Sequence, residues 1–213
     1  MGTPKFSVPV LQALENSSYK ISCVYTQAPK KSNRGHKLNL SSTHKLAQEL
    51  QIPIRSPKNL NSNEELNFFK KLNPDIVVVV AYGQIIPKNF IDIPKKGFVN
   101  IHASILPKWR GAAPIQRSII NLDKETGISV MKIEEGLDSG PVMKKIKIDI
   151  LPNDTSGEIS QKLSKIGSDI IVEVLDNIFN DKVKFIEQEH KFATYAKKIK
   201  KSEGKINWEE NAK

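Results

Sequence analysis

The chain has 213 residues, enough for one sizeable α/β domain with its own hydrophobic core. Its 33 Lys and Arg residues against 23 Asp and Glu residues give a net charge of +10, which favours a polyanionic partner without establishing one. Its apolar runs are too short to span a membrane, and its start lacks the pattern of a secretion signal. Neither the one cysteine nor the four histidines have metal-ligand spacing, so we expect a metal-free cytoplasmic protein.

Helical and extended segments alternate along the chain. This alternation is typical of an α/β fold with a Rossmann-like, mostly parallel, twisted sheet and helices on both faces. Apolar spacing and capping residues predict helices over 7–15, 42–50, 62–72, 112–121 and 155–179. Short apolar runs predict strands over 20–26, 53–56, 75–81, 97–103, 127–133 and 142–150. Capping boxes are expected at Ser62 with Glu65 and at Thr155 with Glu158.

A segment rich in basic residues lies between the first predicted strand and the second predicted helix. Lys30, Lys31, Arg34 and Lys37 stand there among polar residues, with almost no apolar side chain. A flexible basic loop of this kind can follow phosphate groups and release their counterions. The alternative interpretation is a solvated loop without a partner.

An amide and an imidazole stand two residues apart at the end of the predicted strand 97–103. Side chains at positions i and i+2 of a strand leave on the same face, so Asn100 and His102 should point into one cleft. Pro107 and Gly111 are incompatible with a regular continuation of that strand. Polar groups at the end of a strand, above such a loop, occupy the place where open α/β sheets hold their chemistry.

Asp138 adds a carboxylate, in a Gly-bounded turn that follows an apolar strand. An amide, an imidazole and a carboxylate together suit acyl or formyl transfer to an amine. Asn100 would donate to a tetrahedral oxyanion, His102 would polarise the carbonyl or move protons, and Asp138 would hold the protonation state of the imidazole. By spacing alone, a strand-end hydrogen-bonding pair is the simpler interpretation of Asn-x-His. No covalent nucleophile is predicted, because Ser104 lacks a readable base and Cys23 stands in a predicted buried strand.

The surrounding residues resemble the methionyl-tRNA formyltransferase family. The main match is Asn-Ile-His-Ala-Ser-Ile-Leu-Pro at 100–107, which continues as Trp-Arg-Gly-Ala-Ala-Pro-Ile-Gln-Arg at 109–117. Further matches are Gly-Thr-Pro-Lys-Phe at 2–6, Val-Val-Ala-Tyr-Gly at 79–83, Gly-Leu-Asp-Ser-Gly-Pro at 136–141, Asp-Thr-Ser-Gly at 154–157 and Ile-Asn-Trp at 206–208. The Asn-x-His and Asp set is shared by the wider superfamily of 10-formyltetrahydrofolate transferases and hydrolases, so it identifies the chemistry but not the acceptor. Ile105 stands where the family usually has Leu, a near-isosteric change.

This resemblance implies transfer of a formyl group from 10-formyltetrahydrofolate to the α-amino group of methionine on initiator methionyl-tRNA. The implied catalytic residues are Asn100, His102 and Asp138. The implied folate-binding residues, whose backbone groups would bond the pterin edge, are Val79, Ala81, Tyr82, Gly83, Ser104, Ile105, Leu106 and Pro107. The basic loop would grip the acceptor arm of the tRNA through Lys30, Lys31, Arg34 and Lys37.

Two segments are expected along the chain: a catalytic domain over 1–187, and a linker over 188–213 that leads toward a C-terminal β-barrel. The Gly-Thr-Pro turn at 2–4 lacks the strand that should precede it, and the match at 206–208 stands close to the last residue. We therefore expect a chain that is truncated at both ends. We also expect a monomer.

Two other functions remain open. One is a formyltransferase that acts on a sugar nucleotide, on glycinamide ribotide or on another small amine, which the basic loop disfavours. The other is a truncated, non-catalytic relative that binds tRNA, which the intact set of Asn100, His102 and Asp138 disfavours.

Overall fold

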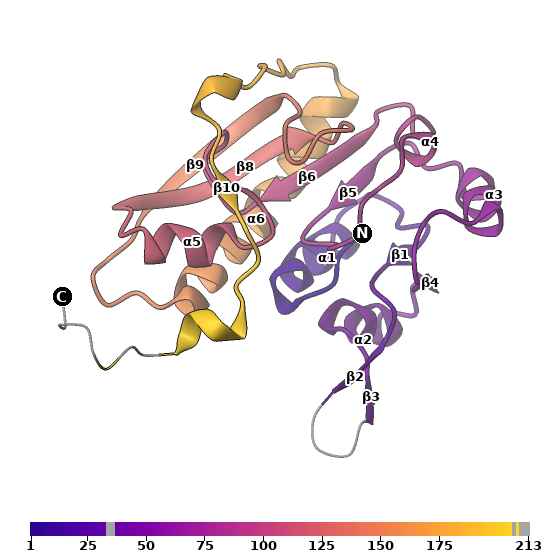
Figure 1. Cartoon of the computed structure of the whole chain (residues 1–213). Coiled ribbons are helices and arrows are strands. Elements are labelled where there is room, and N and C mark those ends of the chain that lie inside the picture. Colours follow the sequence, from indigo (N-terminus) through magenta and orange to yellow (C-terminus); the bar gives the residue numbers. More distant parts are fainter. Residues whose placement is uncertain (33–36, 206–207, 209–213) are drawn as a thin grey trace.

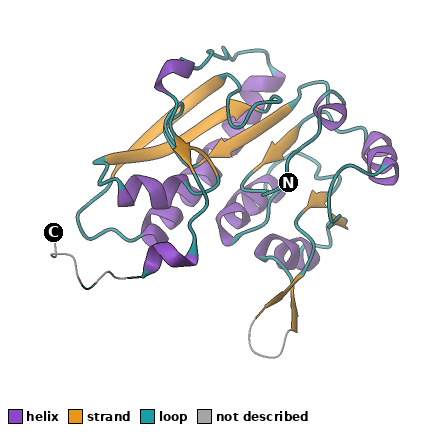
Figure 2. Cartoon of the chain, viewed as in Figure 1, coloured by secondary structure: helices purple, strands orange, loops and turns teal. Residues whose placement is uncertain are grey.

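The computed structural model of the chain describes residues 1–32, 37–205 and 208. Sheets and helices form a layered arrangement, with a β-hairpin projecting from it (Figure 1; Figure 2). The strands are β1 (Val24–Tyr25), β2 (Lys30–Ser32), β3 (Lys37–Asn39), β4 (Ile54–Arg55), β5 (Val77–Val79), β6 (Phe98–His102), β7 (Arg110–Gly111), β8 (Glu125–Lys132), β9 (Val142–Asp149) and β10 (Tyr195–Ala196). The helices are α1 (Val8–Glu15), α2 (Ser42–Glu49), α3 (Asn63–Leu72), α4 (Lys88–Ile91), α5 (Pro114–Ile120) and α6 (Ser156–Phe179), with 3₁₀ turns η1 (Lys5–Ser7), η2 (His190–Phe192) and η3 (Lys201–Gly204).

The largest sheet has the strand order β5-β6-β8-β9. β5 and β6 are parallel, β1 and β4 form a second parallel pair, and Gly2 bridges to Val80 in the same sense. β8 pairs antiparallel with β6, and β9 pairs antiparallel with β8, as expected where the connection 133–141 holds no helix that could cross over the sheet. The predicted α/β, Rossmann-like fold class is confirmed, with this antiparallel extension as an addition that was not predicted.

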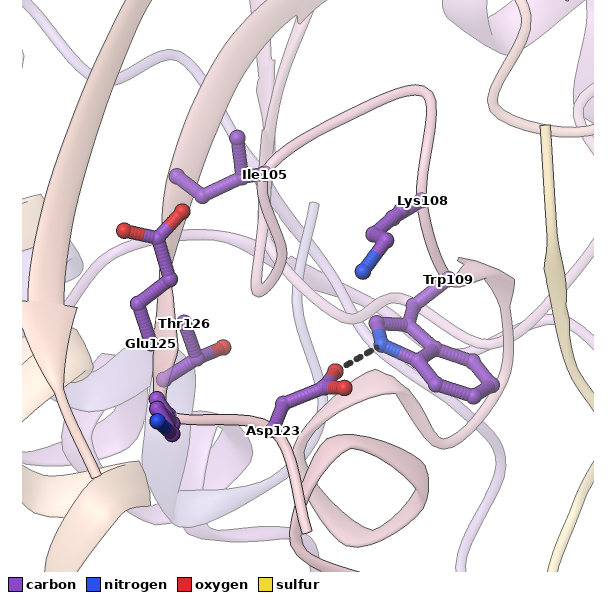
Figure 3. Close-up of a pocket in the computed structure, with 7 residues that line it drawn as sticks. Ile105, Lys108, Trp109, Asp123, Glu125 and Thr126 are labelled. Atoms are coloured by element: carbon purple, nitrogen blue, oxygen red, sulfur yellow. Dashed lines mark hydrogen bonds between the residues drawn. The ribbon is translucent and has the colours of Figure 1, made fainter. Parts of the chain in front are cut away.

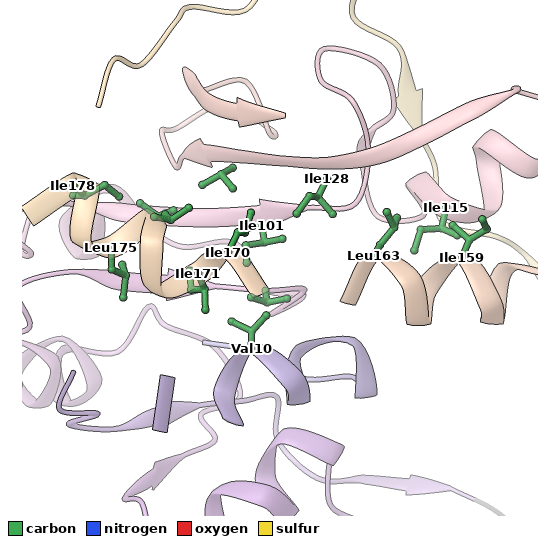
Figure 4. Close-up of a cluster of buried hydrophobic side chains, with 14 residues drawn as sticks. Val10, Ile101, Ile115, Ile128, Ile159, Leu163, Ile170, Ile171, Leu175 and Ile178 are labelled. Atoms are coloured by element: carbon green, nitrogen blue, oxygen red, sulfur yellow. The ribbon is translucent and has the colours of Figure 1, made fainter. Parts of the chain in front are cut away.

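Strands β5 and β6 are covered on both faces, as their near-continuous apolar runs predict. One face packs against α1 and α6, where Val10, Ile101 and Ile171 belong to one buried cluster (Figure 4). The other face packs against α3 and α4, and there Phe98 contacts Phe69 in a second cluster. The end of β6 is therefore held by core packing on both sides.

Helix α6 matches its prediction closely. Four members of the predicted apolar stripe, Ile159, Leu163, Ile170 and Val174, are buried, and the fifth, Ile166, is half-buried against the same cluster. The predicted capping box at its start is present: the Thr155 hydroxyl accepts from the Glu158 backbone N–H at 3.3 Å, and the Glu158 carboxylate accepts from the Thr155 N–H at 2.8 Å.

Replacing Thr155 with alanine is expected to lower the free energy of unfolding by about 1 kcal/mol, because the first turn of α6 loses its capping acceptor. The hydrogen bonds from Thr155 also hold the pKa of the Glu158 carboxyl below its ordinary value. Protonation of Glu158 weakens the bonds that its carboxylate accepts from Thr155, so the parent chain should lose the stabilisation from that carboxylate as the pH falls through the folded-state pKa of Glu158. Urea unfolding of the parent and the T155A variant, each at neutral and acidic pH, measures both effects. Equal stability of the two chains at neutral pH would contradict the capping role.

Two local predictions are wrong. Of the predicted strand 20–26, only Val24–Tyr25 forms a strand, because its partner β4 also has just two residues, and Cys23 lies outside it and is half-buried. The predicted capping box of α3 is half formed. Ser62 accepts from the Glu65 N–H, but the Glu65 carboxylate is buried and bonds the Arg55 guanidinium instead.

Candidate active site

Strand β6 places the amide and the imidazole on one face of the sheet. Asn100 lies opposite Met131 of β8, and His102 lies opposite Ser129. The side chains of Asn100 and His102 leave from the same face of β6 because they are two residues apart. Both residues are nearly enclosed, with relative exposures of 8% and 6%. The polar pair is thus set into the protein rather than spread over its surface.

The imidazole of His102 lies between two oxygen atoms. Its Nδ1 is 3.6 Å from Oδ2 of Asp138, and its Nε2 is 2.9 Å from the backbone oxygen of Trp109. The same carboxylate oxygen of Asp138 accepts from the Gly111 N–H at 2.8 Å. Since both ring nitrogens face acceptors, a doubly protonated imidazole has an oxygen partner for each of its N–H groups.

Asn100 differs from the other two residues, because no residue of the chain forms a hydrogen bond with its side-chain amide among those that the structure describes. The residue as a whole is 8% exposed, and its amide is not among the fully enclosed, unpartnered polar atoms of the described residues, so a bound molecule can reach it. It provides an N–H donor that is free for an oxygen atom of a bound molecule.

The loop after β6 is fixed by its own hydrogen bonds. The Ser104 hydroxyl, fully buried, donates to the Lys108 carbonyl oxygen at 2.6 Å. The Ser129 hydroxyl of β8 donates to the Ser104 carbonyl oxygen and accepts from the Leu106 N–H. The loop therefore keeps the Trp109 carbonyl in place against the imidazole of His102.

The end of this loop pairs with the C-terminal segment through β7 and β10, which run parallel (Figure 1). Arg110 donates its backbone N–H to the Thr194 carbonyl oxygen at 2.9 Å. Gly111 has φ +115° and approaches this strand so closely that a Cβ atom there would lie 3.1 Å from the Ala196 oxygen. Only glycine accommodates both conditions without strain.

The segment 186–196 is the part of the site that the sequence did not reveal. It falls mostly within the stretch predicted as a linker, yet it contacts both the loop after β6 and the turn that carries Asp138. The Arg110 guanidinium, 3% exposed, donates to Gln188 Oε1 and lies 3.2 Å from His190 Nδ1. An irregular segment with one two-residue strand has no periodicity from which these contacts could have been predicted.

The predicted folate-binding residues fall into two groups. The side chains of Val79, Tyr82, Ser104 and Leu106 are buried in the protein, so these residues could meet a ligand only through backbone groups. Ala81 and Gly83 are exposed, and Ile105 and Pro107 are half-buried. The carbonyl oxygens of Tyr82 and Gly83 already accept from the Gln27 side chain, and the Tyr82 oxygen also accepts from the Thr3 hydroxyl.

A pocket of about 190 Å³ lies between the loop after β6 and the start of β8 (Figure 3). It is lined by Ile105, Lys108, Trp109, Asp123, Lys124, Glu125 and Thr126. The Trp109 indole N–H donates to Asp123 at 2.7 Å, whereas the buried Thr126 hydroxyl has no partner among the described residues. Asn100, His102 and Asp138 do not line this pocket, although Trp109 belongs to both places.

The predicted basic loop is in part a β-hairpin, which corrects the expectation of an irregular loop. β2 and β3 pair antiparallel, with Lys31 opposite Leu38 and Ser32 opposite Lys37. In Figure 1 this ribbon projects away from the body of the protein. Arg34 lies outside the described residues, so its predicted contact with tRNA stays a prediction.

Cys23 is poorly suited to covalent catalysis. Burial raises the pKa of its thiol to about 11, so the thiol is protonated at neutral pH. Among the residues that the structure describes, no cluster of His, Cys, Asp and Glu side chains has an arrangement that could hold a metal ion. Within the same part of the chain, no helix has the length and apolar character needed to cross a membrane.

Comparisons with known proteins give a consistent family. The formyl transferase family model matches residues 1–175. The methionyl-tRNA formyltransferase of Pelagibacter ubique is 56% identical over 213 residues, which is the whole of this chain and 69% of the relative. The enzyme of the same name from Brucella canis is 44% identical over 214 aligned positions, covering 100% of this chain and 70% of the relative.

Solved structures of other formyltransferases share the fold. The phosphoribosylglycinamide formyltransferase of Bacillus halodurans has a TM-score of 0.69 at 18% identity, covering 85% of this chain and 93% of its own. The N-formyltransferase of Helicobacter canadensis, solved with folinic acid and dTDP-3-aminofucose, has a TM-score of 0.70 at 19% identity, covering 92% of this chain and 68% of its own. At these identities the likeness concerns the fold alone.

Proposed function

Since this chain belongs to the formyl transferase family, and within it to the methionyl-tRNA formyltransferases, we propose that it moves a formyl group from 10-formyltetrahydrofolate to the α-amino group of methionine on initiator methionyl-tRNA. The observation that carries this proposal is the arrangement at the end of β6. The His102 imidazole lies between the Asp138 carboxylate and the Trp109 carbonyl oxygen, and Asn100 leaves from the same face of the strand as His102.

The reaction needs a donor for the oxyanion and a path for one proton. The neutral amine forms a bond to the formyl carbon, and the electron pair of the carbonyl moves to its oxygen. The bond from that carbon to N10 of the folate then breaks, N10 gains a proton, and the amine loses one, so the protons balance.

We assign the oxyanion donor to Asn100, whose amide has no other partner among the described residues. His102 would supply positive charge beside the oxyanion and carry the proton, after exchanging its contact with the Trp109 carbonyl for one with substrate. Asp138 would keep the ring oriented from the Nδ1 side. In this mechanism, hydrogen bonds and electrostatic interactions stabilise the oxyanion, and the protonated thiol of Cys23 takes no part.

We propose that folate, the second substrate, enters this region and supplies the formyl group. Leu137, next to Asp138, is 61% exposed, and Ile85, in the loop after β5, is 91% exposed. Exposed apolar side chains beside a polar site can cover the flat ring systems of a folate. The backbone of Ala81 and Gly83, and the loop 104–107, would bond its polar edge.

The basic hairpin is the part proposed to hold the tRNA. Lys30, Lys31 and Lys37 stand on its two strands, and Arg34 stands between them in the sequence. Contacts of this kind to phosphates release counterions, so binding should weaken steeply as salt rises. The proposal also includes a monomeric, cytoplasmic protein with its catalytic domain over 1–187.

A formyl-transfer assay tests the proposed function. The chain is supplied with 10-formyltetrahydrofolate and methionyl initiator tRNA, and formylmethionine is measured after hydrolysis of the ester. Formylation of methionyl-tRNA in preference to an amino-sugar nucleotide and glycinamide ribotide is the expected result. Preference for either small amine would favour the alternative acceptor. Salt-dependent binding of tRNA without any formyl transfer would instead favour a non-catalytic tRNA-binding protein.

A further inference from the structure

We propose that Gln188 is a positioning residue for formyl transfer, and that it acts by fixing the turn that carries Asp138. This inference rests on the proposed function, because it assigns Gln188 a role only through the carboxylate of Asp138. Nothing in the sequence marks Gln188, which stands in an irregular segment far from Asp138 along the chain.

The side chain of Gln188 uses all of its polar atoms within the protein. Its Nε2 donates to the carbonyl oxygen of Asp138 at 2.9 Å and to that of Gly140 at 2.7 Å. Its Oε1 accepts from Nε of Arg110 at 3.1 Å and from a terminal nitrogen of Arg110 at 2.7 Å. Gln188 is 6% exposed and Arg110 is 3% exposed, so water competes little for these bonds.

The orientation of the Gln188 amide is determined by its neighbours. The Arg110 guanidinium can only donate hydrogen bonds, and the two carbonyl oxygens can only accept them. The reverse orientation would place N–H against N–H and oxygen against oxygen. Only an amide satisfies both sides at once, because a carboxylate lacks the donors and an amine lacks the acceptor.

The turn that Gln188 holds has little other support. Asp138 has φ +46°, a conformation that costs energy for a residue with a Cβ atom. The residues just before it, 134–137, are exposed. Gln188 bonds the backbone on both sides of Ser139, while the Asp138 side chain reaches Gly111 and His102. Release of the backbone would therefore let the carboxylate move away from the imidazole.

Arg110 connects Gln188 to the loop after β6, which is the second segment that holds the imidazole of His102. Its side chain bonds Gln188, and its backbone carries on from the Trp109 carbonyl that accepts from His102. Gln188 thus lies between the two segments that hold the imidazole, one through Asp138 and one through Trp109. A change at Gln188 should alter the geometry of His102 without any contact between the two side chains.

The Gln188→Glu variant tests the role, because its carboxylate still accepts from Arg110 but cannot donate to the turn. We expect kcat to fall by roughly 10²-fold while the KM for each substrate changes much less, since misplacement of a catalytic group by about 1 Å can cost that much. The variant should keep its fold, and its ring ¹⁵N resonances for His102 should move. Gln161→Ala, at an exposed position on α6, is the matched control. It should change neither kcat nor the His102 ring resonances.

A double-mutant cycle with Asp138→Asn, measured in single turnovers, separates positioning from a general structural effect. If Gln188 acts through Asp138, adding Gln188→Glu to Asp138→Asn should reduce the rate by less than about threefold, because coupled residues are not additive. Equal losses in both backgrounds, or unmoved His102 resonances, would overturn the proposal. Should Gln188→Glu fail to fold, Gln188→Ala, which leaves room for water at Arg110, is measured in the same cycle. An inactive parent chain would instead refute the proposed function.

Discussion

Replacing Asn100 with alanine is expected to lower the turnover of formyl transfer by about 10²- to 10³-fold, the usual cost of removing one oxyanion donor. The reason is specific to this side chain. Its amide has no hydrogen-bond partner among the described residues, so its N–H groups are available when negative charge develops on the formyl oxygen. The measurement is kcat with both substrates saturating, together with folate affinity, which should change by only a few-fold.

Asn100→Asp tests the donor role more specifically than Asn100→Ala does. The carboxylate has nearly the same shape as the amide, but it lacks the donor and adds negative charge where the proposed oxyanion would form. The loss should therefore be at least as large as for alanine. Asn153→Ala, at an exposed position in the turn before α6, is the control and should keep parental turnover. Near-normal turnover of Asn100→Asp would exclude oxyanion donation by this side chain.

Most of the successful predictions depend on patterns among residues that are close together in the sequence. The spacing of Asn100 and His102 predicts a shared face of β6, because the side-chain period of a strand is fixed by backbone geometry. The stripe and the capping box of α6 likewise depend on residues within two or three turns of each other. Such features need no knowledge of the rest of the fold.

The contacts that complete the site come from distant parts of the chain. The carboxylate of Asp138 lies 3.6 Å from the imidazole of His102, in a turn whose backbone bonds Gln188, and it also accepts from the Gly111 N–H. These residues have no common period and no shared element, so composition and spacing carry no signal for them. The resemblance to a family suggested that the carboxylate belongs with Asn100 and His102, but it did not indicate what positions it.

At two places the structure differs from the expectation that composition and local spacing give. Glu65 was predicted to complete a capping box, but burial beside Arg55 gives its carboxylate a charged partner that a backbone N–H cannot match. The basic segment was predicted as a loop from its composition, yet its flanks pair as β2 and β3. In the first case the partner lies outside the helix, and in the second case the two flanks of the segment pair with each other.

Replacing Leu163 with alanine is expected to lower the free energy of unfolding by about 2–5 kcal/mol, a large part of the roughly 5–15 kcal/mol that stabilises a typical domain. Leu163 is fully buried, and it belongs to the cluster through which α6 packs on Ile101 of β6 (Figure 4). Ile101 stands between Asn100 and His102, so the same packing holds the strand that carries both. Urea unfolding measures the loss, with Gln161→Ala on the exposed face of α6 as the control.

In the folded L163A variant, kcat should fall far less than in Asn100→Ala, since the cavity weakens the support of β6 without removing a polar group. A loss below about 1 kcal/mol would mean that the cluster closes around the cavity and that α6 contributes less to holding β6 than its burial indicates.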